Sequence, residues 1–232
     1  MEVNIQEIFK QNLEYISQIE IEPEIIDKQF VKTNTRFYLK VGDIDCPTGK
    51  IAVADPLCHL AGRDYFILTE AIPKGKYPVE VAICRNEYVG IRMCTARLKI
   101  KNTKAIKYIC AKAEESKYSG FSVDAGMMCF CDAQVAKEYI EFIDDWYTKN
   151  PNKNHYDDYF EQFFKDSELK LPQYQREGGD FIEWTNPTSK NKMVMIASGF
   201  GDGFYQSYWG YDEKNEICEL IVPMVNPELY DK

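Results

Sequence analysis

A run of alternating apolar and polar residues in the first half of the chain constrains its fold more than any other feature. Residues 79–84 place apolar side chains at every second position, which is the period of a strand with one buried face. Asn86-Glu87 then predicts a two-residue turn, and residues 88–100 predict the second strand of a hairpin. The apolar positions of that strand change parity at Met93 and Cys94, which predicts a β-bulge there.

Strand-like patterns extend over about residues 36–130. Within them, Pro47-Thr48-Gly49 and Pro73-Lys74-Gly75 have the composition of type I turns, and each precedes a strand-like run. Helical spacing begins after Asp132, which can cap the first of two helical stretches. The two stretches together predict a helical insertion near residues 133–168.

The two ends of the chain complete the pattern. Asn4 is a suitable N-cap, apolar residues repeat at helical spacing from Ile5 to Ile19, and Pro23 closes the segment. We therefore expect an amphipathic N-terminal helix over residues 1–22. Strands return in the last third, at 193–197, 204–211 and 216–223.

This order of strands, helices and strands describes an α+β fold with a mainly antiparallel, sandwich-like sheet. A chain of 232 residues is expected to form a single domain, 1–232. Its core would span residues 46–223, with the N-terminal helix outside that core.

The charge of the chain limits its partners. With 28 Lys+Arg and 37 Asp+Glu, the chain is acidic and its net charge is −9. Nucleic acids and anionic membrane surfaces repel an acidic protein, so neither is an expected partner. No apolar run approaches the roughly 20 residues of a membrane helix, and Met1 to Asn4 lacks the basic start of a signal peptide. We therefore expect a cytoplasmic protein.

Eight cysteines are scattered along the chain. In a cytoplasmic protein of this length they are expected to be reduced. Only Cys129 and Cys131 stand close together, and a structural zinc site would need a second such pair. The sequence therefore predicts buried thiols and no cofactor.

Aspartates stand at the ends of predicted strands. Asp55 follows residues 51–54, Asp124 follows residues 121–123, and Asp202 lies in a glycine-rich loop. Each acid alone is typical of a turn. Strand ends can converge, however, and converging carboxylates can hold a divalent cation or act as a general acid and base. All three are therefore candidate catalytic or metal-binding residues.

The segment Ser198-Gly199-Phe200-Gly201-Asp202-Gly203 is a candidate ligand-binding loop, because its glycines allow another group to approach the backbone closely. A dinucleotide fingerprint would need a further glycine where Phe204 stands, followed by a helix, and an aromatic strand follows instead. A nucleophile elbow would need a glycine where Ile196 stands, so Ser198 is a weak nucleophile candidate. The loop is predicted to form a tight turn or to bind a ligand through Gly199, Gly201 and Gly203.

The strand that follows this loop is aromatic on both faces. Its central residues are Tyr205, Tyr208 and Trp209. One interpretation places them in the core and under a helix, and this interpretation is favoured. The other makes them a face that binds a ligand or a partner, because Tyr and Trp are enriched at interfaces.

Only two histidines are present. His59 lies beside Cys58, which would suit a Cys–His pair or a single metal ligand. Adjacent residues of a strand point to opposite faces, however, so the two would not meet if the segment were extended. His155 stands in a polar helix-start context and is expected to be solvated.

Five segments, taken in order, resemble a known family. They are Pro47-Thr48-Gly49-Lys50, Asp55-Pro56-Leu57, residues 72–79, residues 121–132 and residues 198–212. As an ordered set over about residues 46–222, they are similar to the bacterial domain-of-unknown-function family numbered 4241. The family pattern includes Asp55, Asp124 and Asp202. The resemblance carries no established activity, and it implies the fold more than the function.

Two functions are compatible with these observations. The first is a cytosolic bacterial binding or interaction protein, of accessory or immunity type, that presents its acidic surface and aromatic strand to a protein partner. The alternative is a metal-assisted hydrolase in which Asp55, Asp124 and Asp202 are ligands or acid and base groups. The sequence alone names neither a substrate nor a partner.

Overall fold

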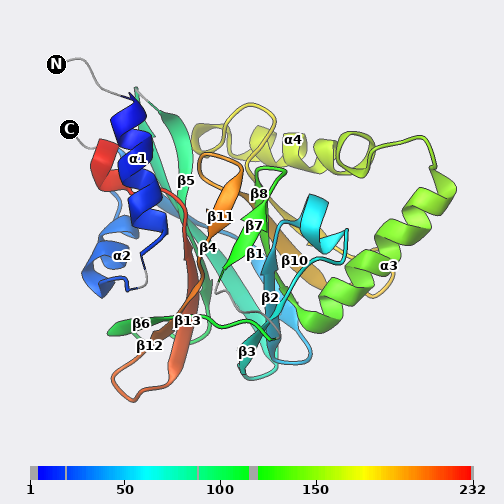
Figure 1. Cartoon of the computed structure of the whole chain (residues 1–232). Helices are drawn as coiled ribbons and strands as arrows, with labels where there is room; N and C mark the ends of the chain where they lie inside the picture. The colour runs from blue at the N-terminus through cyan, green and yellow to red at the C-terminus, as the bar shows by residue number, and fades with distance from the viewer. Residues whose placement is uncertain (1–4, 19, 88, 115–119, 231–232) are drawn as a thin grey trace.

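The computed structural model describes residues 5–18, 20–87, 89–114 and 120–230. Two large antiparallel sheets face each other, and helices lie on both outer sides (Figure 1). The fold is α+β, as the sequence predicts, with an N-terminal helix and a helical insertion. Asn4, Ile19 and Tyr88 lie outside the described residues.

The larger sheet has six strands in the order β1-β4-β5-β13-β12-β6. They are β1 (Arg36–Cys46), β4 (Gly75–Asn86), β5 (Gly90–Lys99), β13 (Ile217–Pro223), β12 (Tyr208–Tyr211) and β6 (Lys107–Cys110). The predicted bulge is confirmed, because Thr95 pairs with Ala82 and Met93 with Ile83, which leaves Cys94 out of the ladder. Asn86 pairs with Gly90, so the loop of the β4–β5 hairpin is three residues long instead of two.

The second sheet has five strands in the order β3-β2-β8-β10-β9. They are β3 (Ile67–Ala71), β2 (Lys50–Ala54), β8 (Met127–Asp132), β10 (Lys192–Ala197) and β9 (Phe181–Thr185). A separate two-stranded sheet pairs β11 (Gly203–Tyr205) with β7 (Phe121–Val123). This small sheet brings the glycine-rich loop beside the turn that follows β7.

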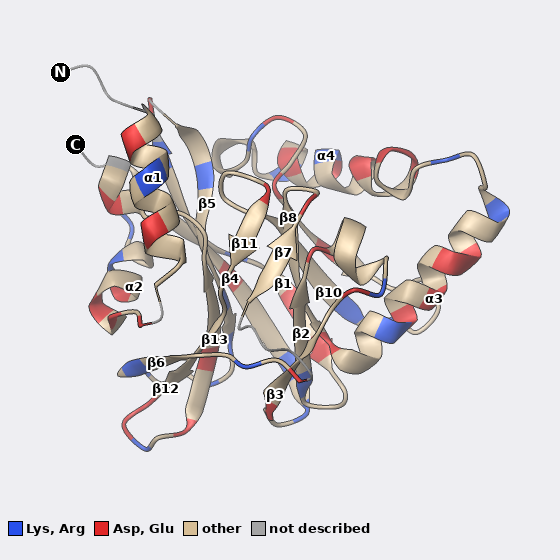
Figure 2. Ribbon diagram, in the orientation of Figure 1, with Lys and Arg blue, Asp and Glu red and all other residues tan. Residues whose placement is uncertain are grey.

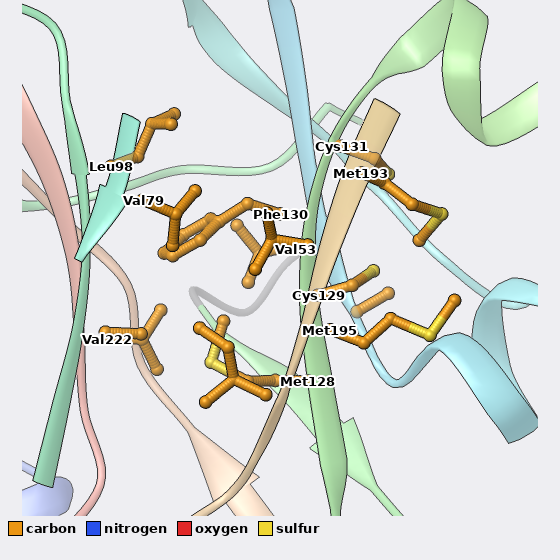
Figure 3. Close-up of a cluster of buried hydrophobic side chains, with 14 of the residues drawn as sticks. Val53, Val79, Leu98, Met128, Cys129, Phe130, Cys131, Met193, Met195 and Val222 are labelled. Atoms are coloured by element: carbon orange, nitrogen blue, oxygen red, sulfur yellow. The ribbon is translucent and has the colours of Figure 1, made fainter. Parts of the chain in front are cut away.

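The core fills the space between the two large sheets. Val79, Leu98 and Val222 of the six-stranded sheet face Met128 and Phe130 of β8, and all five are buried (Figure 3). On the opposite face of β8, Cys129 and Cys131 lie with Met193 and Met195 of β10, as Figure 3 shows. Both faces of β8 are therefore buried, which explains its continuous apolar sequence.

Helices cover the outer faces of the sheets. The two N-terminal helices, α1 (Ile5–Ile16) and α2 (Pro23–Gln29), lie on the side of the six-stranded sheet (Figure 1). The helices α3 (Ala133–Lys149) and α4 (Glu161–Lys170) lie on the other side. Asp132 caps α3 as predicted, since its Oδ1 accepts the N–H of Gln134 at 2.8 Å. None of the described helices is long and apolar enough to cross a membrane.

Strand β1 passes close to the second sheet at a glycine. The pairing of β1 with β4 shifts register between Lys40 and Gly42. A Cβ atom at Gly42 would lie 2.8 Å from Glu183 Cβ and 3.0 Å from Val194 Cγ2. Because those distances are shorter than van der Waals contact, glycine is what lets β1 cross β9 and β10 here.

Three sequence predictions of local structure need correction, and one strand was not predicted. The N-terminal helix ends at Ile16, and Pro23 begins α2 instead of only closing the first helix, because proline fits the first turn of a helix. The predicted strand 204–211 is divided into β11 and β12, which belong to different sheets. Strand β9 was not predicted, since its buried positions do not alternate regularly.

Candidate functional site

Asp55 joins two segments that lie far apart in the chain. It follows β2, is fully buried, and caps the short helix η1 (Pro56–Leu60). Its Oδ1 accepts the backbone N–H groups of Leu57 at 2.8 Å and Cys58 at 3.1 Å. Its Oδ2 accepts those of Asp124 at 2.9 Å and Ala125 at 2.7 Å. These hydrogen bonds compensate for the burial of the carboxylate and fix the turn after β7 against η1.

A second set of bonds joins the same turn to the glycine-rich loop. Asp202 Oδ1 accepts the N–H of Gly126 at 3.0 Å, and the N–H of Ser198 donates to the Gly126 carbonyl at 2.9 Å. Asp124 is 68 % exposed, and its Oδ2 lies 3.1 Å from His59 Nε2. The three candidate aspartates therefore converge on one cluster of loops, and each has its own partner there.

The donor set of this cluster is a poor fit for a cation. Each oxygen of Asp55 already accepts two N–H groups, whose positive ends would face any metal ion placed there. Within the described ranges, no group of three or more His, Cys, Asp or Glu side chains is arranged to hold a metal. The geometry therefore gives Asp55 and Asp202 a structural role, because both accept backbone N–H groups that hold the loops together.

The three glycines of the loop have different surroundings. Gly199 and Gly201 have φ values of 57° and 103°, which favour glycine. A Cβ at Gly199 would lie 2.8 Å from Val225 Cγ2, whereas a Cβ at Gly201 would meet no atom within 4 Å. Gly199 therefore allows close packing, and Gly201 faces open space. Gly203 begins β11.

The aromatic residues that follow the loop lie in the interior. Tyr205 is buried, and its hydroxyl donates to the Ser198 or Gly201 carbonyl, each 2.8 Å away. Tyr208 and Trp209 are buried as well, and Trp209 Nε1 donates to Glu70 Oε2 at 3.0 Å. These side chains present little surface to a ligand, in agreement with the core interpretation.

A cavity of about 540 Å³ lies beside this cluster of loops. Its walls come from four segments, residues 57–58, 125–127, 154–156 and 176–180, together with Ala197 and Gly201. The volume is within the range of small-molecule sites, roughly 300–1,000 Å³. The cavity thus combines loops of the family-like core with the segment between α3 and α4 and the loop that follows α4.

His155 is the residue of this cavity that sequence reasoning misplaced. It is buried, at 8 % exposure, and not solvated, because its ring packs against Tyr147 and Phe160. Its Nδ1 lies 2.7 Å from the Tyr147 hydroxyl, and its Nε2 makes no hydrogen bond. Burial lowers the pKa of His155, while the Leu57 backbone and the charge of Asp55 oppose that change. The ring is therefore neutral near pH 7.

Cys58 is the exposed thiol of the protein. All eight cysteines lie in described segments, none of them forms a disulfide, and Cys58 alone among them is exposed. Partial burial raises the pKa of Cys58, and the charges of Asp55, Asp124 and Asp202 raise it further. Because the thiolate is the nucleophilic form, Cys58 is a poor nucleophile in this position.

Arg176 forms the charged wall of the cavity. Its Nε donates to Oδ1 of the buried Asp180 at 2.8 Å, and its Nη2 lies 2.7 Å from the same oxygen. In this ion pair the positive charge of Arg176 is balanced by the negative charge of Asp180. Glu177, which also lines the cavity, is exposed.

His59 belongs to a different, smaller cavity of about 190 Å³. Cys58 and His59 are neighbours in η1, which is helical instead of extended, and they line different cavities. The structure therefore does not bring them together as a Cys–His pair. His59 instead lies between Asp124 and Asp64, whose Oδ2 is 3.4 Å from His59 Nδ1.

The fold and the site together define an α+β sandwich protein in which loops at the end of the second sheet line a cavity of about 540 Å³. Residues 44–222 match the model of a family described as protein of unknown function (DUF4241). That match covers most of the chain, so the chain belongs to this family, as its motifs predict. No curated protein matches the chain. No solved structure matches it either.

Proposed function

We propose that this protein is a binding protein and that the cavity lined by Cys58, His155 and Gly201 is its recognition site. His155 supports this proposal most directly, because a buried polar ring lines the cavity and keeps Nε2 without a hydrogen-bond partner. A buried polar group that lacks a partner costs about 1–3 kcal/mol. A ligand that bonds to Nε2 would remove that cost.

The groups around the cavity favour binding over bond breaking. Cys58 has a raised pKa and is a weak nucleophile. The Ser198 hydroxyl is buried and donates to the Gly201 carbonyl at 2.9 Å, so it is not poised to attack a substrate. A metal-assisted hydrolase that uses Asp55, Asp124 and Asp202 has no comparable observation in its favour, because backbone N–H groups bind Asp55 and Asp202.

The proposed context is a bacterial cytoplasm, where the protein would act in an accessory or immunity-type role on a protein partner or a small ligand. Its net charge of −9 favours a partner of positive charge. Eight cysteines that form no disulfide are compatible with a reducing compartment.

Alkylation of Cys58 by iodoacetamide tests this function, since the thiol lines the cavity. The reaction is followed in a Cys110→Ser background, because Cys110 is the only other cysteine that is not buried. Small-molecule and protein fractions of a bacterial cell extract are added separately. We expect one fraction to slow the alkylation of Cys58, and Ala125→Phe, which reduces the cavity volume, to abolish that protection. Equal alkylation rates with and without both fractions would contradict the proposal.

A further inference from the structure

The loops around the cavity contain several glycines, but their backbone N–H groups are already bonded. The N–H groups of Ala125 and Cys58 donate to Asp55, and that of Gly126 donates to Asp202. The N–H of Gly178 donates to Glu168 Oε2 at 2.9 Å, and that of Gly201 donates to the Ser198 carbonyl at 2.8 Å. A phosphate-binding loop needs free N–H groups that point at the anion. These loops do not supply that cradle.

The charge around the cavity is negative. Asp55, Asp124 and Asp202 act on the Cys58 thiol through their charges, and the exposed Glu177 lies in the cavity wall. Among the described residues that line the cavity, Arg176 is the one cation, and it is paired with Asp180. Figure 2 shows acidic residues in the loops beside β7, β8 and β11. A low-dielectric wall with this charge concentrates cations.

His155 adds a hydrogen-bonding atom to this field. Its ring is neutral, so one nitrogen carries a proton and the other carries a lone pair. If Nδ1–H donates to the Tyr147 hydroxyl, 2.7 Å away, Nε2 is the acceptor. That hydroxyl is also 3.5 Å from the backbone N–H of His155, for which it serves as the acceptor. In this tautomer the buried Nε2 keeps a lone pair that no group of the described residues uses.

We propose that the cavity binds an ammonium or guanidinium group, held by the acidic loops and hydrogen-bonded to His155 Nε2. This proposal rests on the proposed function and specifies its ligand chemistry. The group comes either from a free amine or from a Lys or Arg side chain of a protein. In both cases it carries N–H donors, which can bond to Nε2, and a positive charge, which complements the acidic loops.

Isothermal titration of the full chain tests the ligand chemistry. The cationic probes are agmatine, putrescine and the blocked peptide acetyl-Gly-Arg-Gly-amide, and the matched controls are neutral 1,4-butanediol and anionic succinate. We expect at least one cationic probe to bind with a Kd of about 1 mM or lower and to slow Cys58 alkylation, and neither control to do so. Binding of agmatine or putrescine alone identifies a free amine, whereas binding of the peptide alone identifies a protein side chain.

A pair of charge variants tests the site of binding. Asp202→Asn keeps an oxygen that can accept the Gly126 N–H and removes one negative charge beside the cavity. We expect it to weaken binding of the cation by about three- to tenfold. Asp145→Asn removes the same charge from the exposed face of α3, where Asp145 pairs with Lys149, and should leave the affinity unchanged. If wild type, Asp202→Asn and Asp145→Asn bind the cation with equal affinity, the claim that the acidic loops beside this cavity hold it is overturned.

The two proposals fail separately. If succinate or butanediol binds and the cations do not, the cation inference is overturned and the binding function stands. The same holds if a cell fraction protects Cys58 while no cationic probe binds. If no probe binds and no cell fraction protects Cys58, both proposals are overturned.

Discussion

The carboxylate of Asp55 accepts the backbone N–H of Asp124, although 69 residues separate them in the chain. This bond places the end of β2 beside the turn after β7, and the cavity lies against both segments. Asp55 is therefore a structural residue of the site, and Asp124, which is 68 % exposed and lies beside His59, contributes negative charge at the surface of the same loops.

The first prediction concerns the stability of this link. Asp55→Asn replaces one carboxylate oxygen with an NH₂ group, which is a donor. The two backbone N–H groups that this oxygen accepts would then lose their acceptor. We expect a loss of about 2–4 kcal/mol in the free energy of unfolding, measured by urea denaturation. The matched variant Asp124→Asn, on an exposed side chain, should change it by no more than about 0.5 kcal/mol. Equal stability of the two variants would mean that Asp55 does not hold the loops.

The second prediction concerns the crossing of β1 over the second sheet. Gly42→Ala would place a Cβ 2.8 Å from Glu183 Cβ, so the strands must separate. We expect a loss of about 1–3 kcal/mol in unfolding free energy. Gly75→Ala is the control, because its Cβ would meet only the Tyr77 ring at 3.5 Å or more. A Gly42→Ala protein as stable as Gly75→Ala would contradict the close approach.

The third prediction is a pH dependence that originates at His155. Burial lowers the pKa of His155 below its ordinary value of 6.5, so the unfolded chain binds a proton at a higher pH than the folded chain. The contribution of neutral His155 to the free energy of unfolding is therefore fully present above pH 6.5. It is lost as the pH falls toward the pKa that His155 has in the folded protein. His155→Gln removes this contribution. The difference in unfolding free energy between wild type and variant should therefore change from pH 7.5 to 5, and a constant difference would refute the assignment.

The fourth prediction concerns the reactivity of Cys58. Its pKa lies above the ordinary thiol value of 9.0, because of partial burial and the three nearby aspartates. At pH 8 the thiol should therefore react with iodoacetamide more slowly than a free cysteine peptide. Asp202→Asn should lower the pKa and speed the reaction by up to a few-fold, as a pH–rate profile would show. An unchanged pH–rate profile would mean that the charge of Asp202 does not affect the pKa of Cys58.

The sequence predicted those features that depend only on residues close together in the chain. The parity change at Met93 and Cys94 predicted the bulge, because a strand with one buried face must shift register when its apolar positions do. Asp132 was predicted as the cap of α3 because capping depends on residues within one turn.

Features that depend on distant contacts were not predictable in this way. The run 204–211 reads as one strand, and only pairing with β7 on one side and β13 on the other divides it. His155 stands among polar residues in the sequence, and its burial depends on Tyr147, Phe160 and the cavity wall. The sequence indicated that strand ends can converge but left open whether these three aspartates meet. The bonds of Asp55 and Asp202 to backbone N–H groups follow from loop geometry that no spacing reveals.

The ring ¹⁵N spectrum of the two histidines tests the central claim most directly, because one lies in the cavity and the other outside it. We predict that free His155 is neutral with an unprotonated Nε2, and that saturating agmatine shifts the Nε2 resonance while the His59 resonances stay in place. An unchanged His155 spectrum at saturating agmatine, or a shift confined to His59, would contradict the account.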